Sequence, residues 1–293
     1  MSPFWADLSL VYCAAVWGAT FFMVKDALAG VDPVALVAHR FLLSALLLAP
    51  WALTRKTRFH HLKESFWLGV LLFLLYVSQT VGLGYTSASN SGFITGLFVI
   101  FVPLFLLVFL GRPPTTVQWA SSGLALAGLW LLTGGIRSAN FGDVITLIAA
   151  ATYAGHLLVT DLSVKADADP VILAFHQFWM TGVLAAVAAW FVGRPFAVAG
   201  VRTGATIVFL AVVPTLSAFF IQMLAQKTVP AVKVSLIFLL EPVFAAIFAW
   251  TIGGEKFSAG RAAGGGLIVA AMLAGELSKL DLLKGRRKEI LPT

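Results

Sequence analysis

Two charged residues lie deep inside long apolar stretches of this sequence. Arg40 stands seven residues after Pro33, and Glu241 stands directly before Pro242, eleven residues into another apolar stretch. Seven helical residues span roughly 10 Å, and charges at such depth in an apolar helix face protein or a water-filled cavity. We expect Arg40 to bind a solute carboxylate and Glu241 to bind a solute ammonium group or a proton. The alternative is that the two charges pair with each other, or with helix ends, and are structural.

The spacing that follows Arg40 recurs in the second half of the chain. Arg40 and Ser44 are four residues apart, and so are Gln177 and Thr181. Residues four apart share one face of a helix. Each pair therefore predicts a polar helix face that lines a cavity.

A histidine precedes each of these polar faces by one residue. His39 and His176 lie about 100° around their helices from that face, so they either flank the same cavity or fill contacts between helices. Neutral imidazole is a common metal ligand, and a haem held by both histidines is a rival hypothesis. Our preferred interpretation contains neither a metal nor another cofactor.

Aromatic and hydrogen-bonding side chains supply the remaining candidates. A mostly apolar pocket with a few placed polar groups suits an amphipathic solute. Aromatic residues of membrane helices also pack or anchor at the interface, and this alternative stays open for each of them. The candidate substrate-binding residues are Trp17, His39, Arg40, Tyr76, Gln79, Tyr85, Asn90, Tyr153, His156, His176, Gln177 and Trp179.

The composition indicates the solvent in which these residues work. Of 293 residues, 60% are hydrophobic and 11% are charged, against roughly 25% charged in soluble domains, so the chain is built for a lipid bilayer. The single cysteine, Cys13, excludes a disulfide within the chain and a multi-cysteine metal cluster. The net charge of +7 comes from basic residues in loops and in the tail, which argues against a nucleic-acid partner. We expect a monomer.

Ten apolar segments are long enough to cross a bilayer as helices, which takes roughly 20 residues each. The first segment lacks the basic start and the cleavage site of a signal peptide, so we keep it as a helix. The predicted fold class is an all-α integral membrane protein. The predicted helices cover residues 6–25, 34–53, 66–83, 89–110, 116–135, 142–163, 170–192, 205–224, 230–251 and 261–278.

Lys and Arg are unevenly distributed between the two sides of this arrangement. The side that holds both termini carries 13 of them, the other side carries 6, and Arg40 lies within a helix. By the positive-inside rule both termini face the cytoplasm. An even number of spans agrees with that orientation.

The chain also repeats itself. The stretch "DPVALVAHRF" from Asp32 matches "DPVILAFHQF" from Asp169, and Trp17 lines up with Tyr153. Six identities in ten residues indicate an internal duplication.

The duplication divides the chain into two predicted repeats, residues 1–136 and 137–279, followed by a basic cytoplasmic tail at 280–293. Five helices per repeat is an odd number, so the two copies enter the membrane from opposite faces. Inverted repeats of this kind are typical of transporters that open to each side in turn around a central site. A duplication kept only for packing is the alternative.

Proline and glycine residues predict how some of these helices bend and pack. Pro103 and Pro242 are expected helix bend points, because proline removes a backbone hydrogen bond. Small residues let helices approach closely in membranes. Gly264, Gly265 and Gly266, with the small residues of "ASSGLALAG", therefore predict tight packing of the fifth and tenth helices.

With these features the chain resembles the EamA-type drug/metabolite transporters. The resemblance rests on "WGATFF", "HRFLLSALLL", the mid-helix Pro103 and Pro242 and the ending "GGEKFSAGRAAGGGLIVAA", and it covers nearly the whole chain. Length and aromatic content are similar to those of the YddG-type amino-acid exporters within that family. The resemblance implies export of aromatic and other apolar amino acids across a bacterial inner membrane. One departure is Arg112, which stands where the second repeat has the family-like Glu255.

Other functions compete with amino-acid export. A membrane enzyme is disfavoured because the sequence has no phosphate-binding glycine loop, acidic pair or zinc-binding helix motif. Drugs, nucleotide sugars and metal ions are competing cargoes for a transporter. No ATP-binding motif is present, so the energy must come from the solute gradient or from a coupled ion.

Overall fold

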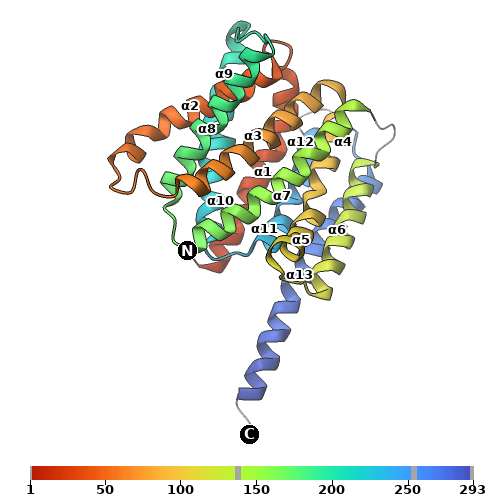
Figure 1. Cartoon of the computed structure of the whole chain (residues 1–293). Helices are drawn as coiled ribbons and strands as arrows, with labels where there is room; N and C mark the ends of the chain where they lie inside the picture. The colour runs from red at the N-terminus through yellow and green to blue at the C-terminus, as the bar shows by residue number, and fades with distance from the viewer. Residues whose placement is uncertain (1, 136–139, 252–255, 291–293) are drawn as a thin grey trace.

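Helices form every regular element of the computed structural model, which describes residues 2–135, 140–251 and 256–290 (Figure 1). The predicted junction of the two repeats and Glu255 lie outside these residues. The first part of the chain forms α1 (Pro3–Ala27), α2 (Pro33–Thr54), α3 (Leu62–Tyr85), α4 (Ala88–Gly96), α5 (Phe98–Leu110) and α6 (Thr116–Thr133). The second part forms α7 (Phe141–Lys165), α8 (Pro170–Phe191), α9 (Gly200–Leu210), the π-helix η1 (Ala211–Ser217), α10 (Ala218–Gln226), α11 (Ala231–Phe238), α12 (Leu240–Thr251) and α13 (Ala259–Ile290).

The repeated Asp-Pro stretches start α2 and α8 in the same way. Asp32 caps α2 by accepting a hydrogen bond from the Val34 amide at 2.8 Å, and Asp169 caps α8 by accepting one from the Val171 amide at 2.9 Å. Each Asp is followed by a proline at the first helical position, where a missing N–H costs nothing. The two helices lie antiparallel against each other.

All ten predicted segments are helical, and three of them are interrupted. The fourth breaks at Leu97 between α4 and α5, and the ninth breaks at Leu239 between α11 and α12. Both breaks precede the predicted bend points, since Pro103 lies inside α5 and Pro242 lies in the first turn of α12. The eighth segment widens into η1 in its middle.

Eight helical stretches among the described residues are long and apolar enough to cross a membrane. Two predicted spans, α6 and the apolar part of α13 at Ala259–Gly275, are not among them. Ten spans therefore stay a prediction. The segment predicted as a tail continues α13 as far as Ile290.

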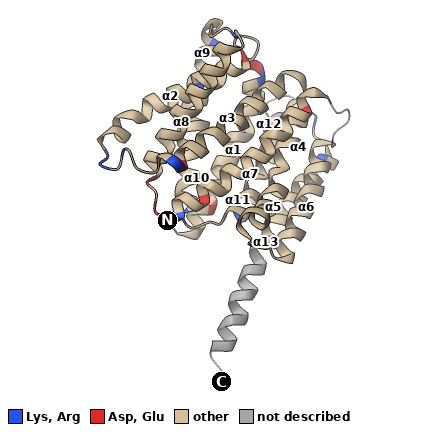
Figure 2. Cartoon of the chain, viewed as in Figure 1, with Lys and Arg blue, Asp and Glu red and all other residues tan. Residues whose placement is uncertain are grey.

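The outside of the bundle is apolar. Figure 2 shows charged residues near the two ends of the bundle and very few in the middle of the visible face. Leu46, Phe109 and Trp190 are 69%, 70% and 71% exposed. Apolar surface on this scale is compatible with lipid as the surrounding solvent. We call the end of the bundle at which α1 begins the terminal face, and the other end the opposite face.

The predicted close packing of the fifth and tenth helices is confirmed. The helices α6 and α13 pack along each other, and a methyl group at Gly128 would lie 2.7 Å from the Gly264 carbonyl oxygen. A methyl group at Gly264 would overlap the backbone nitrogen of Leu132. Gly266 has open space around its Cα, so only some of the glycines carry this contact.

Candidate functional site

A cavity lies among α1, α3, α7, α10 and α12 in the interior of the bundle. The space in it that water could occupy is about 20 Å³, so the cavity is narrow in this structure. Its lining combines aromatic rings with a few hydrogen-bonding groups. The lining residues are Trp17, Thr20, Leu75, Tyr76, Gln79, Tyr153, Phe219 and Glu241. Five of the residues singled out from the sequence therefore meet at one site, brought there from four helices.

Glu241 places a carboxyl group in the cavity wall. It lies in the first turn of α12, directly after the break at Leu239, and only 7% of it is exposed. Among the described residues no basic group lies within 4.0 Å of it. Burying an ionised carboxylate is costly unless a cation or a proton neutralises it. Glu241 can therefore receive a proton or a cationic group of a ligand.

Gly18 lets α12 come close enough to deliver Glu241. A methyl group at Gly18 would lie 2.5 Å from the Glu241 carbonyl oxygen and 3.0 Å from the Phe244 side chain. The glycine that follows Trp17 in the sequence therefore has a packing role. It brings the backbone of α1 and α12 together at the level of the cavity.

Arg40 lies behind the cavity wall and does not line it. It is 2% exposed, and its guanidinium carbon lies 4.5 Å from the centre of the Tyr76 ring. Its Nη2 donates to the Tyr76 hydroxyl at 3.4 Å, and its Nε donates to the Thr215 hydroxyl. Among the described residues no carboxylate lies within 4.0 Å of the guanidinium. The structure thus contains no Arg40 to Glu241 ion pair, and Tyr76 stands between a buried positive charge and the cavity.

The π-helix η1 holds Arg40 and Trp17 in place. Its Pro214 has no backbone N–H, so one carbonyl group of the preceding turn lacks its usual helical donor. The Pro214 carbonyl accepts the Trp17 indole N–H at 2.7 Å. The Thr215 hydroxyl accepts from Arg40 and donates to the Leu210 carbonyl at 2.7 Å.

Sequence reasoning did not identify the η1 residues or Phe219. The one available signal was Pro214 in the middle of the predicted eighth helix, comparable with Pro103 and Pro242 in the fourth and ninth. It indicates an irregular helix. It does not indicate which side chains the irregularity serves.

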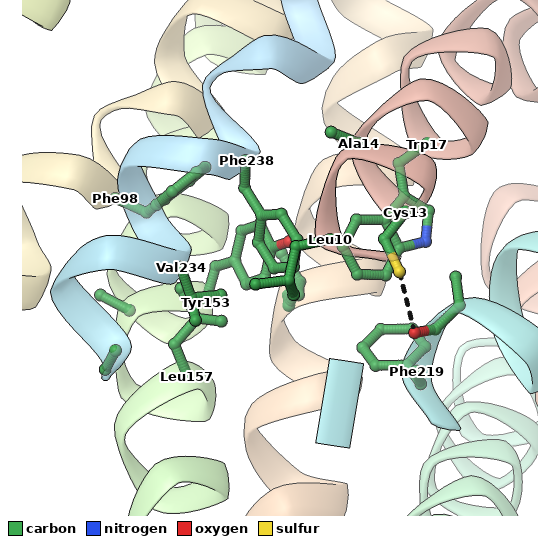
Figure 3. Packing of buried hydrophobic residues seen from close by; sticks show 14 of the residues in the cluster. Leu10, Cys13, Ala14, Trp17, Phe98, Tyr153, Leu157, Phe219, Val234 and Phe238 are labelled. Atoms are coloured by element: carbon green, nitrogen blue, oxygen red, sulfur yellow. Dashed lines mark hydrogen bonds between the residues drawn. The ribbon is translucent and has the colours of Figure 1, made fainter. Parts of the chain in front are cut away.

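Three aromatic residues of the lining, Trp17, Tyr153 and Phe219, belong to the buried aromatic packing that Figure 3 shows. The Trp17 ring lies 5.2 Å from the Phe219 ring and 4.9 Å from the Phe238 ring. Tyr153 lies 6.4 Å from Trp17 in an edge-to-face contact. Such contacts stabilise the lining by about 0.5–1.5 kcal/mol per pair beyond burial. The aromatic lining is therefore a packed surface, not a set of loose side chains.

Two predicted histidines lie at opposite ends of the α2 and α8 pair. His39 Nδ1 is 2.6 Å from the Ala35 carbonyl, and its ring faces Phe196 beyond the end of α8. His176 Nε2 donates to the Arg58 carbonyl, beyond the end of α2, at 2.7 Å. A haem shared by both is incompatible with this placement, and no metal-binding group of three or more His, Cys, Asp or Glu occurs in the part of the chain that the structure describes.

The remaining predicted residues also lie outside the cavity. Trp179 donates its indole N–H to His176 Nδ1 at 2.9 Å. Tyr85 is 61% exposed and packs on Phe141, and Asn90 lies half-buried in the first turn of α4. His156 and Gln177 pair with each other at 2.9 Å and are fully buried.

Comparison with known proteins identifies a family and several relatives. A sequence model of the EamA-like transporter family matches this chain twice, at residues 4–134 and 140–274. An uncharacterized transporter of Archaeoglobus fulgidus is 29% identical over 275 residues, which cover 92% of this chain and 85% of the relative. The uncharacterized transporter YwfM of Bacillus subtilis is 26% identical, with 86% and 87% covered. The uncharacterized inner membrane transporter YedA of Escherichia coli is also 26% identical, with 94% and 92% covered.

Solved structures share the fold, and one crystal structure among them serves as the comparison. It superposes with a TM-score of 0.81 over 96% of this chain and 99% of its own, at 18% sequence identity. At 18% sequence identity this similarity shows a shared arrangement of helices and nothing about function.

Proposed function

Because this chain belongs to the EamA-like transporter family, and is therefore a multi-pass membrane transporter, we propose that it exports amino acids, with aromatic and other apolar ones favoured. The observation that carries this proposal is the chemistry of the central cavity. Its wall holds one carboxyl group without a basic partner among the described residues, and a tyrosine backed by a buried guanidinium, between aromatic rings.

These groups complement the three parts of an apolar amino acid. The ammonium group would bind Glu241, since a hydrogen bond between charged groups is among the strongest in proteins. The carboxylate of the solute would accept a hydrogen bond from the Tyr76 hydroxyl. That hydroxyl is contacted by the Arg40 guanidinium, whose positive charge favours a nearby carboxylate. The side chain would lie against Trp17, Tyr153 and Phe219, where burial from water favours aromatic and other large apolar groups.

The architecture that we propose has ten spans in two inverted repeats, residues 1–136 and 137–279, with the cavity between them. Two family matches of similar length support the duplication. Contacts also recur in pairs when the helices are matched by the repeat: α1 packs on α10 and α12, and its counterpart α7 packs on α3 and α5. Opening the cavity to one face and then the other would move the solute across the membrane.

The proposed location is a bacterial inner membrane with both termini in the cytoplasm. The excess of Lys and Arg on the side of the termini, 13 against 6, supports this orientation. The name of the relative YedA supports the inner membrane.

Counterflow into proteoliposomes tests the proposal. Vesicles preloaded with one unlabelled amino acid should accumulate labelled phenylalanine, tryptophan or leucine. Glu241→Gln should reduce this exchange roughly ten- to a hundredfold, because a hydrogen bond to a charged group contributes about 1.5–3 kcal/mol. Glu64→Gln is the matched control, since Glu64 lies at the start of α3 with its side chain 43% exposed, and it should exchange as the parent protein does.

The same assay distinguishes the alternative cargo. An exporter of cationic drugs would need only Glu241 and the aromatic faces, because cations bind both carboxylates and rings. Exchange of a lipophilic cation, with none of any amino acid, would reject the amino-acid proposal and favour a drug exporter. An equal loss of exchange in Glu241→Gln and Glu64→Gln would show that Glu241 has no specific role in binding the solute.

A further inference from the structure

Five fully buried polar side chains come from α7, α8 and α10, and one of them, His156, contacts the Phe219 ring. His156 and Thr160 come from α7, Gln177 from α8, and Gln222 and Gln226 from α10, and each is 0% exposed. We call this set the polar column. Glutamine, histidine and threonine are rarely buried completely, least of all together in a protein whose solvent is lipid.

Five of the nine polar side-chain atoms of the polar column have hydrogen-bond partners. The His156 Nε2 and Gln177 Oε1 atoms are 2.9 Å apart. Gln222 Nε2 donates to Gln226 Oε1 at 2.8 Å, and Gln226 Nε2 donates to the Leu157 carbonyl at 3.0 Å. These bonds link α7 to α8 and α7 to α10.

The other four atoms have no partner among the described residues: His156 Nδ1, Thr160 Oγ1, Gln177 Nε2 and Gln222 Oε1. Buried polar atoms without a partner are uncommon and costly, and a half-satisfied network is less favourable than an apolar core. The set contains an amide donor, an amide acceptor and a hydroxyl that can do both, which is the combination that water or a polar solute satisfies.

The polar column extends from the cavity toward the terminal face. His156 and Thr160 are one helical turn apart on α7, and Gln222 and Gln226 are one turn apart on α10. At its outer end lie charged residues of the terminal face, where Lys165 contacts Asp161 at 2.7 Å and Lys227 contacts Asp167 at 3.7 Å.

Phe219 separates the column from the cavity. Its ring lines the cavity beside Trp17, at 5.2 Å, and its other contacts include the His156 ring at 5.6 Å. One aromatic ring thus lies between the proposed solute site and the first polar group of the column.

The internal repeat provides an independent comparison. Thr20 stands three residues after Trp17, and His156 stands three residues after Tyr153, so the two occupy matching positions in helices that the repeat relates. Thr20 lines the cavity, whereas His156 is 0% exposed. Thr20 thus borders the cavity, although it is only 8% exposed, and its counterpart does not. A difference between matching positions is expected when the two halves of an alternating-access protein stand in different states.

We propose that the polar column is the terminal-face half of the solute path, closed in this structure by Phe219 and hydrated when that side opens. Water entering the column would satisfy the four unpartnered atoms. The proposal rests on transport through the central cavity and does not depend on amino acids being the cargo.

Thiol labelling from the terminal face tests the column. Cys13 is the single cysteine, so Cys13→Ser provides a background in which a new cysteine is the only target. Gln222→Cys is placed in the column. Met223→Cys is the matched control, because Met223 is equally buried on the same helix but is apolar and 100° away. A membrane-impermeant methanethiosulfonate with a quaternary ammonium group is applied to vesicles whose terminal face is exposed, and labelling is followed by intact mass.

Gln222→Cys should react at least ten times faster than Met223→Cys. Adding Phe219→Ala to the Gln222→Cys variant should make its labelling faster still. Equal rates for the two cysteines would overturn the proposal and leave the column as packing. If Gln222→Cys does not fold, Thr160→Cys against Ala154→Cys, both at positions that are 0% exposed on α7, makes the same comparison. Labelling requires no transported solute, so a failed counterflow assay and a failed labelling assay are distinguishable.

Discussion

The helices α2 and α8 are alike at their ends and different in their middles. Arg194 lies 3.8 Å from Asp32 at the start of α2, and Arg55 lies 3.9 Å from Asp169 at the start of α8. Each helix is therefore capped by an Asp that contacts an Arg beyond the end of its partner. The two ion pairs lie at opposite ends of the bundle and repeat the same chemistry.

The middles of the two helices hold a charge in one copy and an amide in the other. Ser44 donates to the Ala211 carbonyl of η1 at 2.9 Å, and Thr181 donates to the Gly69 carbonyl of α3 at 3.0 Å. These matching hydroxyl contacts place each helix against the backbone of its neighbour. One turn earlier the copies diverge, since Arg40 contacts Thr215 of η1, whereas Gln177 contacts His156 of α7.

The difference follows from the neighbouring helices. The α3 helix is regular along its length, whereas its counterpart in the second repeat is interrupted by η1. Only the π-helix offers a hydroxyl and a widened turn for a guanidinium. The comparison teaches that the two copies agree at their helix ends, and that they differ in the middle, where each helix meets a different neighbour.

The largest expected effect comes from making the second copy like the first. Gln177→Arg should give no folded protein, or a protein destabilised by about 3–5 kcal/mol, because the new guanidinium would be buried without an acceptor equivalent to Thr215. Size-exclusion chromatography in detergent and the thermal unfolding midpoint measure this. Gln177→Met is the control that removes the amide without adding charge, and it should fold. If Gln177→Arg folds normally, the middle of α8 can accept an arginine as the middle of α2 does, and the explanation by the neighbouring helices is wrong.

A smaller effect is expected at the other pair of repeat-related helices, α6 and α13, which meet through glycine. Gly264→Ala should cost about 1–3 kcal/mol, since overpacking a close backbone contact forces the helices apart. Gly266→Ala on the same helix has open space at its Cα and should be neutral or slightly stabilising. Thermal midpoints compare the two. Equal midpoints would contradict the view that this part of the frame depends on close backbone approach.

The smallest effect is expected at the matching ion pairs. The Arg55 and Arg194 side chains are 52% and 54% exposed, and exposed ion pairs contribute about 0–1 kcal/mol. Arg55→Gln and Arg194→Gln should therefore lower the unfolding midpoint slightly and to a similar extent, and their effects should add in the double variant. If one variant alone lowered the free energy of unfolding by well over 1 kcal/mol, the two ion pairs would not be equivalent.

Much of the frame could be predicted because it depends on local sequence. The Asp-Pro starts of α2 and α8 are recognisable from the chain alone, and the apolar stretches between them have to be helical if lipid surrounds them. The cavity was partly predictable as well. Trp17 and Tyr153 match in the repeat, and Glu241 is conspicuous as a charge in an apolar helix.

The partners of these residues could not be predicted in the same way. Arg40 and Tyr85 both looked like lining residues, yet Arg40 lies behind Tyr76 and Tyr85 is exposed at the end of α3. A sequence indicates which residues share one face of a helix. It does not indicate how far that helix is rotated or how deep it lies against its neighbours.

The sequence by itself determined that this chain is a bundle of apolar helices with a duplicated frame, because caps, helix length and hydrophobicity are local properties. The tertiary structure alone decided that Thr215 accepts from Arg40, and that Phe219 stands between the cavity and His156. Those contacts join residues that are distant in the chain, and they depend on how all the neighbouring helices pack at once.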